Sequence, residues 1–185
     1  MSEKVEAKVL LREEEKELLA KLLERAESTD IKGDTWHEMV KKFITVPVEL
    51  CVLDTENKVF LVYRKDREFD GYHLPGTVVT DWETVHDARL RIVTSEIKEH
   101  AGFDISYPES VGWIEVKRGT GPDCNPTRHT AALLHIAHQV SDFTPREGSG
   151  FYSFDNIPEN TLPDHKFMLR YFKRYLENGQ AILGE

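Results

Sequence analysis

Three glutamates and a histidine lie close together in one stretch of the sequence and could bind a cation: Glu83, Glu96, Glu99 and His100. Carboxylate oxygens are the ligands that Mg²⁺ prefers, and a carboxylate can also take a proton from water. At about 100° per helical residue, Glu96, Glu99 and His100 project on the same side as Ile92. Burying such groups is costly unless a cation or another partner compensates them. The spacing therefore predicts a divalent-cation site.

The local sequence predicts the element that carries these groups. The segment 74–77 (Leu-Pro-Gly-Thr) cannot be helical, because Pro75 lacks an N–H and restricts the residue before it. Thr84 can cap a helix, and Asp87 three residues on completes a capping box. Gly102 is a natural end, because glycine adopts the left-handed conformation without steric cost. We expect one α-helix between these limits, with two apolar stripes facing the core: Val85, Ala88 and Ile92, and Leu90, Val93, Ile97 and Ala101.

The stretch 71–103 resembles the sequence motif of the Nudix hydrolases. That motif runs Gly, five residues, Glu, seven residues, then Arg-Glu-aliphatic-any-Glu-Glu-any-Gly-aliphatic. Thr77 stands at its first glycine. In a register without a gap, Glu83 is the first motif glutamate and Arg91 the motif arginine. Glu96 then keeps the last glutamate position, while Ile92 and Ser95 replace the other two.

A second register fits the same motif when four residues are inserted and the count runs back from Gly102. Glu96 and Glu99 then occupy the first two positions of the glutamate cluster, and His100 the third. We favour this register, because two residues three positions apart on a helix can share an ion. Glu83 would then position a ligand residue rather than bind the ion itself.

The resemblance implies an α/β fold, a Nudix-type α/β/α sandwich with a mixed sheet. It also implies a bound Mg²⁺, or Mn²⁺ if His100 takes part. The expected metal ligands are drawn from Glu83, Glu96, Glu99, His100 and the backbone at Gly76. Glu96 and Glu99 are the expected catalytic residues, one of them accepting the proton of the attacking water.

Within that family, the layout most resembles the GDP-mannose mannosyl hydrolases. Arg64 and Arg67 precede Gly71-Tyr72, and Thr127-Arg128-His129 opens a late strand. The resemblance implies substrate-binding roles for Arg64, Arg67 and His129, and a guanidinium fork is suited to phosphate.

The remaining chain predicts a helical extension over 1–45 and a Nudix-like domain over 46–185. Val9 to Ala26 has the pattern of an amphipathic helix, and Thr35 starts a shorter one. A hairpin over 46–64, strands over 110–118, 128–140 and 151–154, and a last helix over 164–177 follow. We expect the first helix to pack on the domain or on a second subunit, which makes a homodimer possible.

Composition excludes several classes of partner. The 185 residues carry a net charge of −9, and the sequence pI is about 5.4. We therefore expect no nucleic acid and no anionic membrane as partners. No signal peptide or apolar run of about 20 residues is evident, so we expect a cytoplasmic protein. Cys51 and Cys124 form neither a disulfide framework nor a metal-binding spacing.

Two functional hypotheses follow. The first is a divalent-metal-dependent hydrolase of a nucleoside diphosphate linked to another moiety, such as a nucleotide sugar. The second is a Nudix-fold nucleotide-binding or regulatory module with impaired catalysis. Replacement of motif glutamates by isoleucine or histidine, and of the motif glycine by Thr77, favours the second.

Overall fold

A computed structural model of the chain describes residues 13–25, 42–65, 69–80, 83–119, 122–125, 128–144 and 148–179. The chain divides into two units, 1–37 and 38–185. In the first unit the described element is helix α1, Glu13–Arg25, which lies within the amphipathic helix predicted from the sequence. Its side chains Leu18 and Leu22 are exposed, at 58% and 53%. The predicted helix from Thr35 lies almost entirely outside the described residues.

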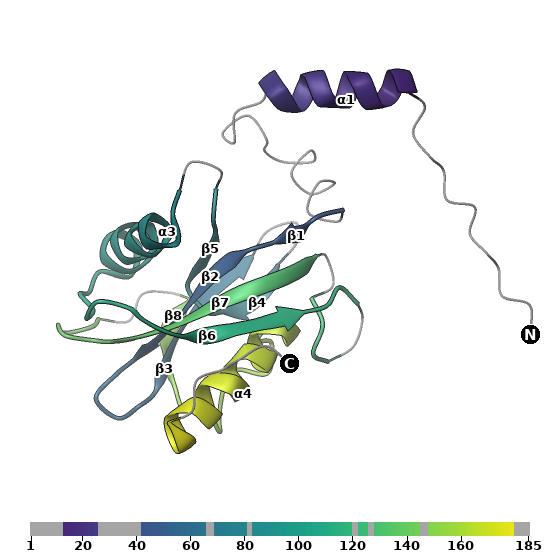
Figure 1. Ribbon diagram of the computed structural model, residues 1–185. Helices are drawn as coiled ribbons and strands as arrows, with labels where there is room; N and C mark the ends of the chain where they lie inside the picture. Colours follow the sequence, from purple (N-terminus) through teal and green to yellow (C-terminus); the bar gives the residue numbers. More distant parts are fainter. Residues whose placement is uncertain are drawn as a thin grey trace, which may run out of the picture. The chain divides into compact units, whose positions relative to one another are not determined.

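The second unit is a mixed eight-stranded sheet with helices on both faces (Figure 1). Its strands are β1 Ile44–Thr45, β2 Pro47–Leu53, β3 Val59–Lys65, β4 Asp70–His73, β5 Gly76–Val78, β6 Glu109–Val116, β7 His129–His138 and β8 Ser149–Tyr152. Its helices are α3 Val85–Arg91, η1 Ile92–Ala101 and α4 Pro163–Asn178. The strands run in the order β1-β7-β2-β3-β4, with β5 paired to β2, β6 to β7 and β8 to β3.

Strand β2 lies in the middle of this sheet and is buried along its whole length. It runs parallel to β7 and antiparallel to β3 and β5. Parallel strands covered on both faces are expected to be continuously apolar, and β2 follows this rule except at Glu49. Glu49 lies 3.9 Å from His165 of α4, in a buried group of polar side chains.

Alternate residues of the central strands face two separate cores. Val48, Leu50 and Val52 pack with residues of α3 and η1, whereas Cys51 and Leu53 pack with residues of α4. The helices therefore cover opposite faces, which gives the predicted α/β/α sandwich with a mixed sheet (Figure 1). Burial raises the pKa of the Cys51 thiol.

The predicted helix of the motif stretch is present, but its second half is not α-helical. It is capped at Thr84, continues as α-helix to Arg91, and is then a π-helix to Ala101, ending at Gly102 in the left-handed conformation. The expected inward positions are partly wrong, and the two exposed ones lie in the α-helical half. Val85 and Leu90 are 36% and 41% exposed, while Ala88, Ile92, Ile97 and Ala101 are buried. The buried positions recur at four, five and four residues, as the wider π turn requires.

The other predicted elements are found with small shifts at their ends. The hairpin turn at 54–57 is held by the Asp54 carboxylate, which accepts from the N–H groups of Glu56 and Lys58, both at 2.8 Å. The last strand lies at Ser149–Tyr152, two residues before the predicted 151–154. Strand β1, at Ile44–Thr45, pairs with β7, so the sheet begins before residue 46. None of the described helices has the length and apolar character needed to cross a membrane.

Candidate functional site

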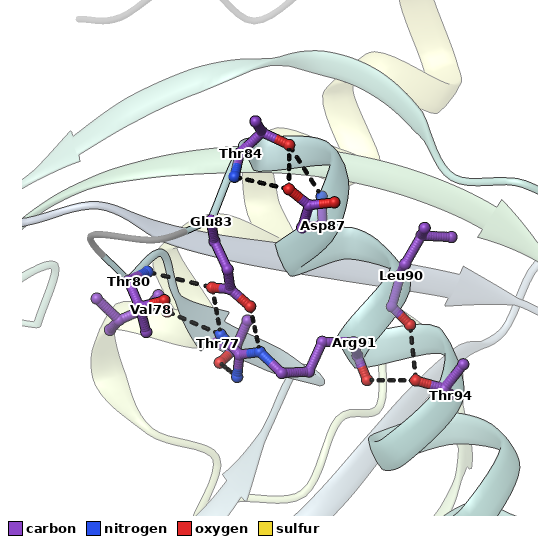
Figure 2. A network of polar contacts seen from close by, with 9 residues as sticks. All are labelled: Thr77, Val78, Thr80, Glu83, Thr84, Asp87, Leu90, Arg91 and Thr94. Carbon is purple, nitrogen blue, oxygen red and sulfur yellow. Dashed lines mark hydrogen bonds and ion pairs between the residues drawn. The ribbon is translucent and has the colours of Figure 1, made fainter. Parts of the chain in front are cut away.

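Arg91 lies at the centre of a polar network between α3 and β5 (Figure 2). Its Nε donates to Oε1 of Glu83 at 2.6 Å, and its Nη2 donates to Oε2 at 2.7 Å. The guanidinium also donates to the Thr77 hydroxyl and to the Val78 carbonyl. Arg91 therefore joins the helix to β5 and to the segment before the helix.

Both oxygens of Glu83 are used in this network. Oε2 accepts a third hydrogen bond, from the N–H of Thr80 at 3.1 Å. The bonds from Arg91 are the main cause that lowers the pKa of Glu83, because they favour its charged form. Glu83, predicted among the metal ligands, thus serves to hold Arg91 and Thr80 in this structure.

The start of α3 follows from the capping box that the sequence predicted. Asp87 N–H donates to the Thr84 hydroxyl at 3.2 Å, and Thr84 N–H donates to the Asp87 carboxylate at 2.9 Å. Hydrogen bonds from Thr84 are the main cause that lowers the pKa of Asp87. The box fixes the first turn one residue after Glu83, which sets the direction from which Arg91 reaches that carboxylate.

The change from α- to π-helix sets the position of Glu96. Thr94 donates its hydroxyl to the carbonyls of Leu90 and Arg91, at 2.9 and 3.3 Å, where the α-helical pattern ends (Figure 2). In a π turn the backbone hydrogen bonds join residues five apart, and Glu96 lies five positions after Arg91. The Glu96 charge accordingly contributes to the raised pKa of Arg91, after the larger effect of Glu83.

Glu96 and Glu99 are on the same helix but differ in burial. Glu96 is half-buried, whereas Glu99 is exposed. His100 belongs to η1, and its side chain lies outside the described part of the structure. The sequence analysis assumed α-helical spacing between Glu96 and Glu99, whereas the structure places both in a π-helix, which has a wider turn.

The donor groups available to a cation are few. Within the described residues, no group of three or more His, Cys, Asp and Glu side chains converges as a metal site. Mg²⁺ is often bound by one or two carboxylates together with substrate phosphates, and it keeps several waters. Glu96 and Glu99 fit that smaller donor set.

Two arginines stack on one aromatic ring elsewhere in the same unit. The Arg64 guanidinium, at the end of β3, lies 4.7 Å from the ring centroid of Phe69. Arg128, just before β7, lies 5.4 Å from the same centroid. Stacking of this kind is attractive and holds both side chains in place. The structure thus joins predicted Arg64 to Arg128, while Arg67 lies outside the described residues.

The histidines of β7 have separate surroundings. His129 Nε2 is 2.7 Å from Oε1 of Glu115 on the neighbouring strand β6. His135 is buried, and burial with the nearby Arg89 charge lowers its pKa to about 4. His138 is exposed at the end of the strand. The three histidines therefore lie in three different environments.

A buried group of polar side chains lies where α4 begins, and the sequence reasoning missed it. Glu49 of β2 and His165 of α4 are 7% exposed, and Asp164 is 4% exposed. The His165 Nδ1 atom is 3.9 Å from Oε2 of Glu49, and its Nε2 atom is 4.0 Å from Oδ2 of Asp164. Asn125 donates to Asp164 at 2.5 Å. The His73 ring stands edge-on to His165, with centroids 5.6 Å apart.

Burial favours the neutral forms of Glu49, His165 and His73. It is the main cause that raises the pKa of Glu49 well above its usual range, and the Asp164 charge adds to it. Burial also lowers the pKa of His165, and it lowers that of His73 to about 4. Arg128 opposes the effect on Glu49, which shows that its charge reaches this group.

One signal in the sequence could have indicated this group. Glu49 is the only charged residue of the strand Pro47–Leu53, and a carboxylate in a fully buried strand calls for a partner. It pairs across the sheet with Gly76. A Cβ atom at Gly76 would lie 2.2 Å from Oε2 of Glu49, so glycine makes the room for this carboxyl group. The other members are far away in sequence and show no pattern.

Comparison with known proteins supports the fold. No protein-family model matches the sequence, and no curated protein matches it. Among solved structures, a UDP-X diphosphatase is similar with a TM-score of 0.56 and 15% identity, over 91% of this chain and 82% of that one. An ADP-ribose pyrophosphatase from Streptococcus suis 89-1591 has a TM-score of 0.53 and 19% identity, over 77% and 98%.

A third similar structure is a Nudix hydrolase from Nitrosomonas europaea, with a TM-score of 0.55 and 20% identity over 77% of this chain and 78% of that one. At these identities the likeness concerns the arrangement of helices and strands. The chain has the fold of the Nudix hydrolases.

Proposed function

We propose that this protein hydrolyses a nucleoside diphosphate joined to a further group, such as a nucleotide sugar, with Mg²⁺ or Mn²⁺. The observation that carries the proposal is the pair of guanidinium groups, Arg64 and Arg128, on the ring of Phe69. In a chain with a net charge of −9, two adjacent arginines are a local concentration of positive charge. Guanidinium forks match phosphate oxygens in geometry and charge.

The chain's own groups would divide the work as follows. Arg64 and Arg128 bind the diphosphate, with Arg67 and His129 as further substrate contacts implied by the resemblance. Glu96 and Glu99 hold the cation, together with the backbone at Gly76, and one of the two glutamates takes the proton of the attacking water. When bound, such an ion neutralises phosphate charge and lowers the pKa of a bound water.

Arg91 has a positioning role in this proposal. It connects α3 to the Thr77 hydroxyl and the Val78 carbonyl, so it fixes β5 relative to the helix that carries Glu96. Glu83 keeps the Arg91 guanidinium in place through two hydrogen bonds. Misplacement of catalytic groups by about 1 Å can cost a factor of about 100 in rate, so this support matters for catalysis.

The second candidate function is nucleotide binding without hydrolysis. It is favoured by the buried side chain of Ile92, which is 1% exposed at a glutamate position of the motif. It is also favoured by the small donor set, because within the described residues no three potential metal ligands converge. Binding by Arg64 and Arg128 would be common to both functions.

The test is a panel of nucleotide sugars, ADP-ribose and dinucleoside polyphosphates, incubated with the full chain with and without Mg²⁺ or Mn²⁺. Products are separated by anion exchange, and binding is followed by thermal shift. A ligand at 100 times its dissociation constant stabilises the protein by about 2.7 kcal/mol. Metal-dependent products support the hydrolase. Stabilisation without products supports the binding module. If neither products nor stabilisation is observed, both functions are contradicted.

The arginine pair has a matched control within the same unit. Arg64→Ala and Arg128→Ala should each weaken binding of the active compound at least tenfold. Arg174, whose guanidinium lies 5.7 Å from the ring centroid of Tyr171, makes the same kind of stacking contact on α4. Arg174→Ala should leave binding unchanged. Equal losses in all three variants would show that stacking, and not phosphate contact, is what matters.

A further inference from the structure

The buried polar group at the start of α4 has one unmet hydrogen-bonding atom. Oε2 of Glu49 is buried and has no hydrogen-bond partner among the described residues. Its side chain is 9% exposed, and His165 Nδ1, at 3.9 Å from Oε2, is too far for a hydrogen bond. Native proteins satisfy nearly all such atoms, so an exception calls for an explanation.

The surrounding groups cannot satisfy this atom as they stand. His165 Nδ1 already accepts the N–H of Leu74 at 3.2 Å, so it has no proton to give to Glu49. Asp164 accepts from Asn125, and Asn125 accepts the N–H of Arg128 at 3.0 Å. His165, Asp164 and Asn125 thus have hydrogen-bond partners, whereas Oε2 of Glu49 has none among the described residues.

Asn125 links this group to Arg128, because it donates to Asp164 and accepts the N–H of Arg128 at 3.0 Å. The Arg128 charge acts on both Glu49 and His165, and the Arg64 charge acts on His73. These are the two arginines that stack on Phe69. The positively charged arginine pair and the buried hydrogen-bonding group around Glu49 are therefore neighbours. A ligand that matches both has an anionic part joined to an uncharged part with hydrogen-bond donors and acceptors.

We propose that Glu49, with Asp164 and His165 beside it, recognises the uncharged hydrogen-bonding part of a ligand whose phosphates are bound at Arg64 and Arg128. This inference rests on the proposed function and specifies its substrate. The uncharged part carries either sugar hydroxyls or the ring nitrogens and oxygens of a base, which offer the same chemistry. A protonated Glu49 donates one hydrogen bond and accepts another. The ligand supplies the hydrogen-bond partner that Oε2 lacks among the described residues.

The experiment measures dissociation constants by isothermal titration calorimetry of the full chain. The probes are pyrophosphate, which has phosphates alone, ribose 5-phosphate, which adds hydroxyls, and uridine monophosphate, which adds a base. Glu49→Met keeps the volume and removes the hydrogen bonds. It should weaken at least one of the two larger probes tenfold or more and leave pyrophosphate within twofold. Loss with ribose 5-phosphate assigns sugar hydroxyls, and loss with uridine monophosphate alone assigns the base.

A second variant separates recognition from folding. Glu49→Gln keeps both shape and neutrality, so its affinities at pH 7 should stay within threefold of the parent. The affinity of Glu49→Gln for the larger probe should therefore exceed that of Glu49→Met at least threefold, because only glutamine keeps a hydrogen-bond donor and acceptor at this place. The groups that face Glu49 or His165 from the packed elements are His73, Asp164 and Arg128, and these three are unchanged in both proteins.

The outcomes distinguish this inference from the proposed function. Equal weakening of pyrophosphate and the larger probes in Glu49→Met, or no weakening at all, would overturn the role of Glu49. In that case Arg64→Ala and Arg128→Ala still test the phosphate site through pyrophosphate. If the parent binds none of the probes, both proposals fail. If Glu49→Met does not fold, Asp164→Asn and His165→Gln replace it, and affinities for the larger probes within twofold of the parent in both variants overturn the inference.

Discussion

Glu83 and Arg91 are joined at both carboxylate oxygens, with N–O distances of 2.6 and 2.7 Å. Glu83 lies just before the N-cap of α3, and Arg91 is the last residue of that helix, eight positions later. A paired, bidentate arrangement of this kind is short and strong because both partners are charged. Both carboxylate oxygens of Glu83 are therefore engaged by Arg91 in this structure.

The first prediction concerns the contribution of this pair to stability. Glu83→Gln removes the charge and one acceptor, and it should lower the free energy of unfolding by about 1–2 kcal/mol. The Glu83 side chain is 16% exposed and that of Arg91 41%, so solvent weakens the pair. Asp155→Asn is the control, because Asp155 is 77% exposed in its pair with Lys173 and should change stability by about 0.5 kcal/mol or less.

The pH dependence of the same variant tests the charge. The pKa of Glu83 is lowered in the folded state, so its stabilisation is present above the unfolded value of about 4.3. It is lost as pH falls through the lowered folded value. Urea unfolding at several pH values should therefore show the parent and Glu83→Gln converging below about pH 4. A constant difference would attribute the effect to shape.

The second prediction tests the close approach of Gly76 to Glu49. A Cβ atom at residue 76 would meet Oε2 and Cδ of Glu49 at 2.2 and 2.7 Å. Because Glu49 is buried, it cannot move aside freely, and Gly76→Ala should destabilise the protein by about 1–3 kcal/mol. At Gly150 the nearest atoms are side-chain atoms of Tyr152 at 3.4 Å, so Gly150→Ala is the control with a small effect.

A double variant assigns the cost of Gly76→Ala to the Glu49 carboxyl group. In a Glu49→Ala background, the clash is gone and Gly76→Ala should cost much less than in the parent. The difference is the interaction energy of a double-mutant cycle, measured by denaturant unfolding. Strict additivity would mean that the extra methyl group acts on the backbone alone.

The sequence predicted those features that depend on neighbouring residues. Thr84 and Asp87 form a capping box within one turn, and Gly102 ends the helix by its own conformation. The hairpin turn is likewise local, since Asp54 bonds to residues two and four positions later. Such signals need no knowledge of the tertiary structure, and they placed the central helix and most strands within one or two residues.

The features that the sequence did not predict depend on packing. The π-helical turns between Ile92 and Ala101 bury Ile97 five positions after Ile92, a spacing that an α-helical count does not predict. The buried polar group joins residues 49 and 165, which are brought together only when α4 covers the sheet. A helical period or a strand alternation carries no information on either.

The third prediction concerns acid sensitivity. The pKa of buried His135 is lowered to about 4, against about 6.5 in an unfolded chain, so the unfolded state binds more protons between these values. The contribution of neutral His135 to the free energy of unfolding is fully present above about pH 6.5. It falls by about 2–3 kcal/mol as the pH is lowered to 4. The Nδ1 atom of His135 lies 3.3 Å from the Leu133 carbonyl.

The measurement is the free energy of unfolding of the parent and of His135→Gln at intervals from pH 7 to pH 4. The variant should show a flatter decline, with the remaining slope including His73, whose pKa is also lowered to about 4. His138→Gln is the control, because His138 is exposed on the same strand. If the declines of the parent and His135→Gln coincide, His135 is not the source.

The last prediction orders three glutamates by their contribution to cation binding. Glu83 is held by Arg91 and Thr80, so a cation would have to displace hydrogen bonds to reach it. Glu96 and Glu99 lie on η1 as the two carboxylates of the proposed ion. In the presence of a bound nucleotide, Mn²⁺ affinity measured by electron paramagnetic resonance should fall most in Glu96→Gln and Glu99→Gln, and by less in Glu83→Gln.

Glu109→Gln is the control for charge alone, since this glutamate begins β6 and is exposed. The variants also separate direct binding from positioning. Glu83→Gln should lose stability together with a modest part of its Mn²⁺ affinity, because the support of Arg91 is weakened. Glu99→Gln should lose affinity without losing stability. The reverse order of the Mn²⁺ losses would assign the ion to Glu83 and Glu96, and it would place Glu99 beyond the site.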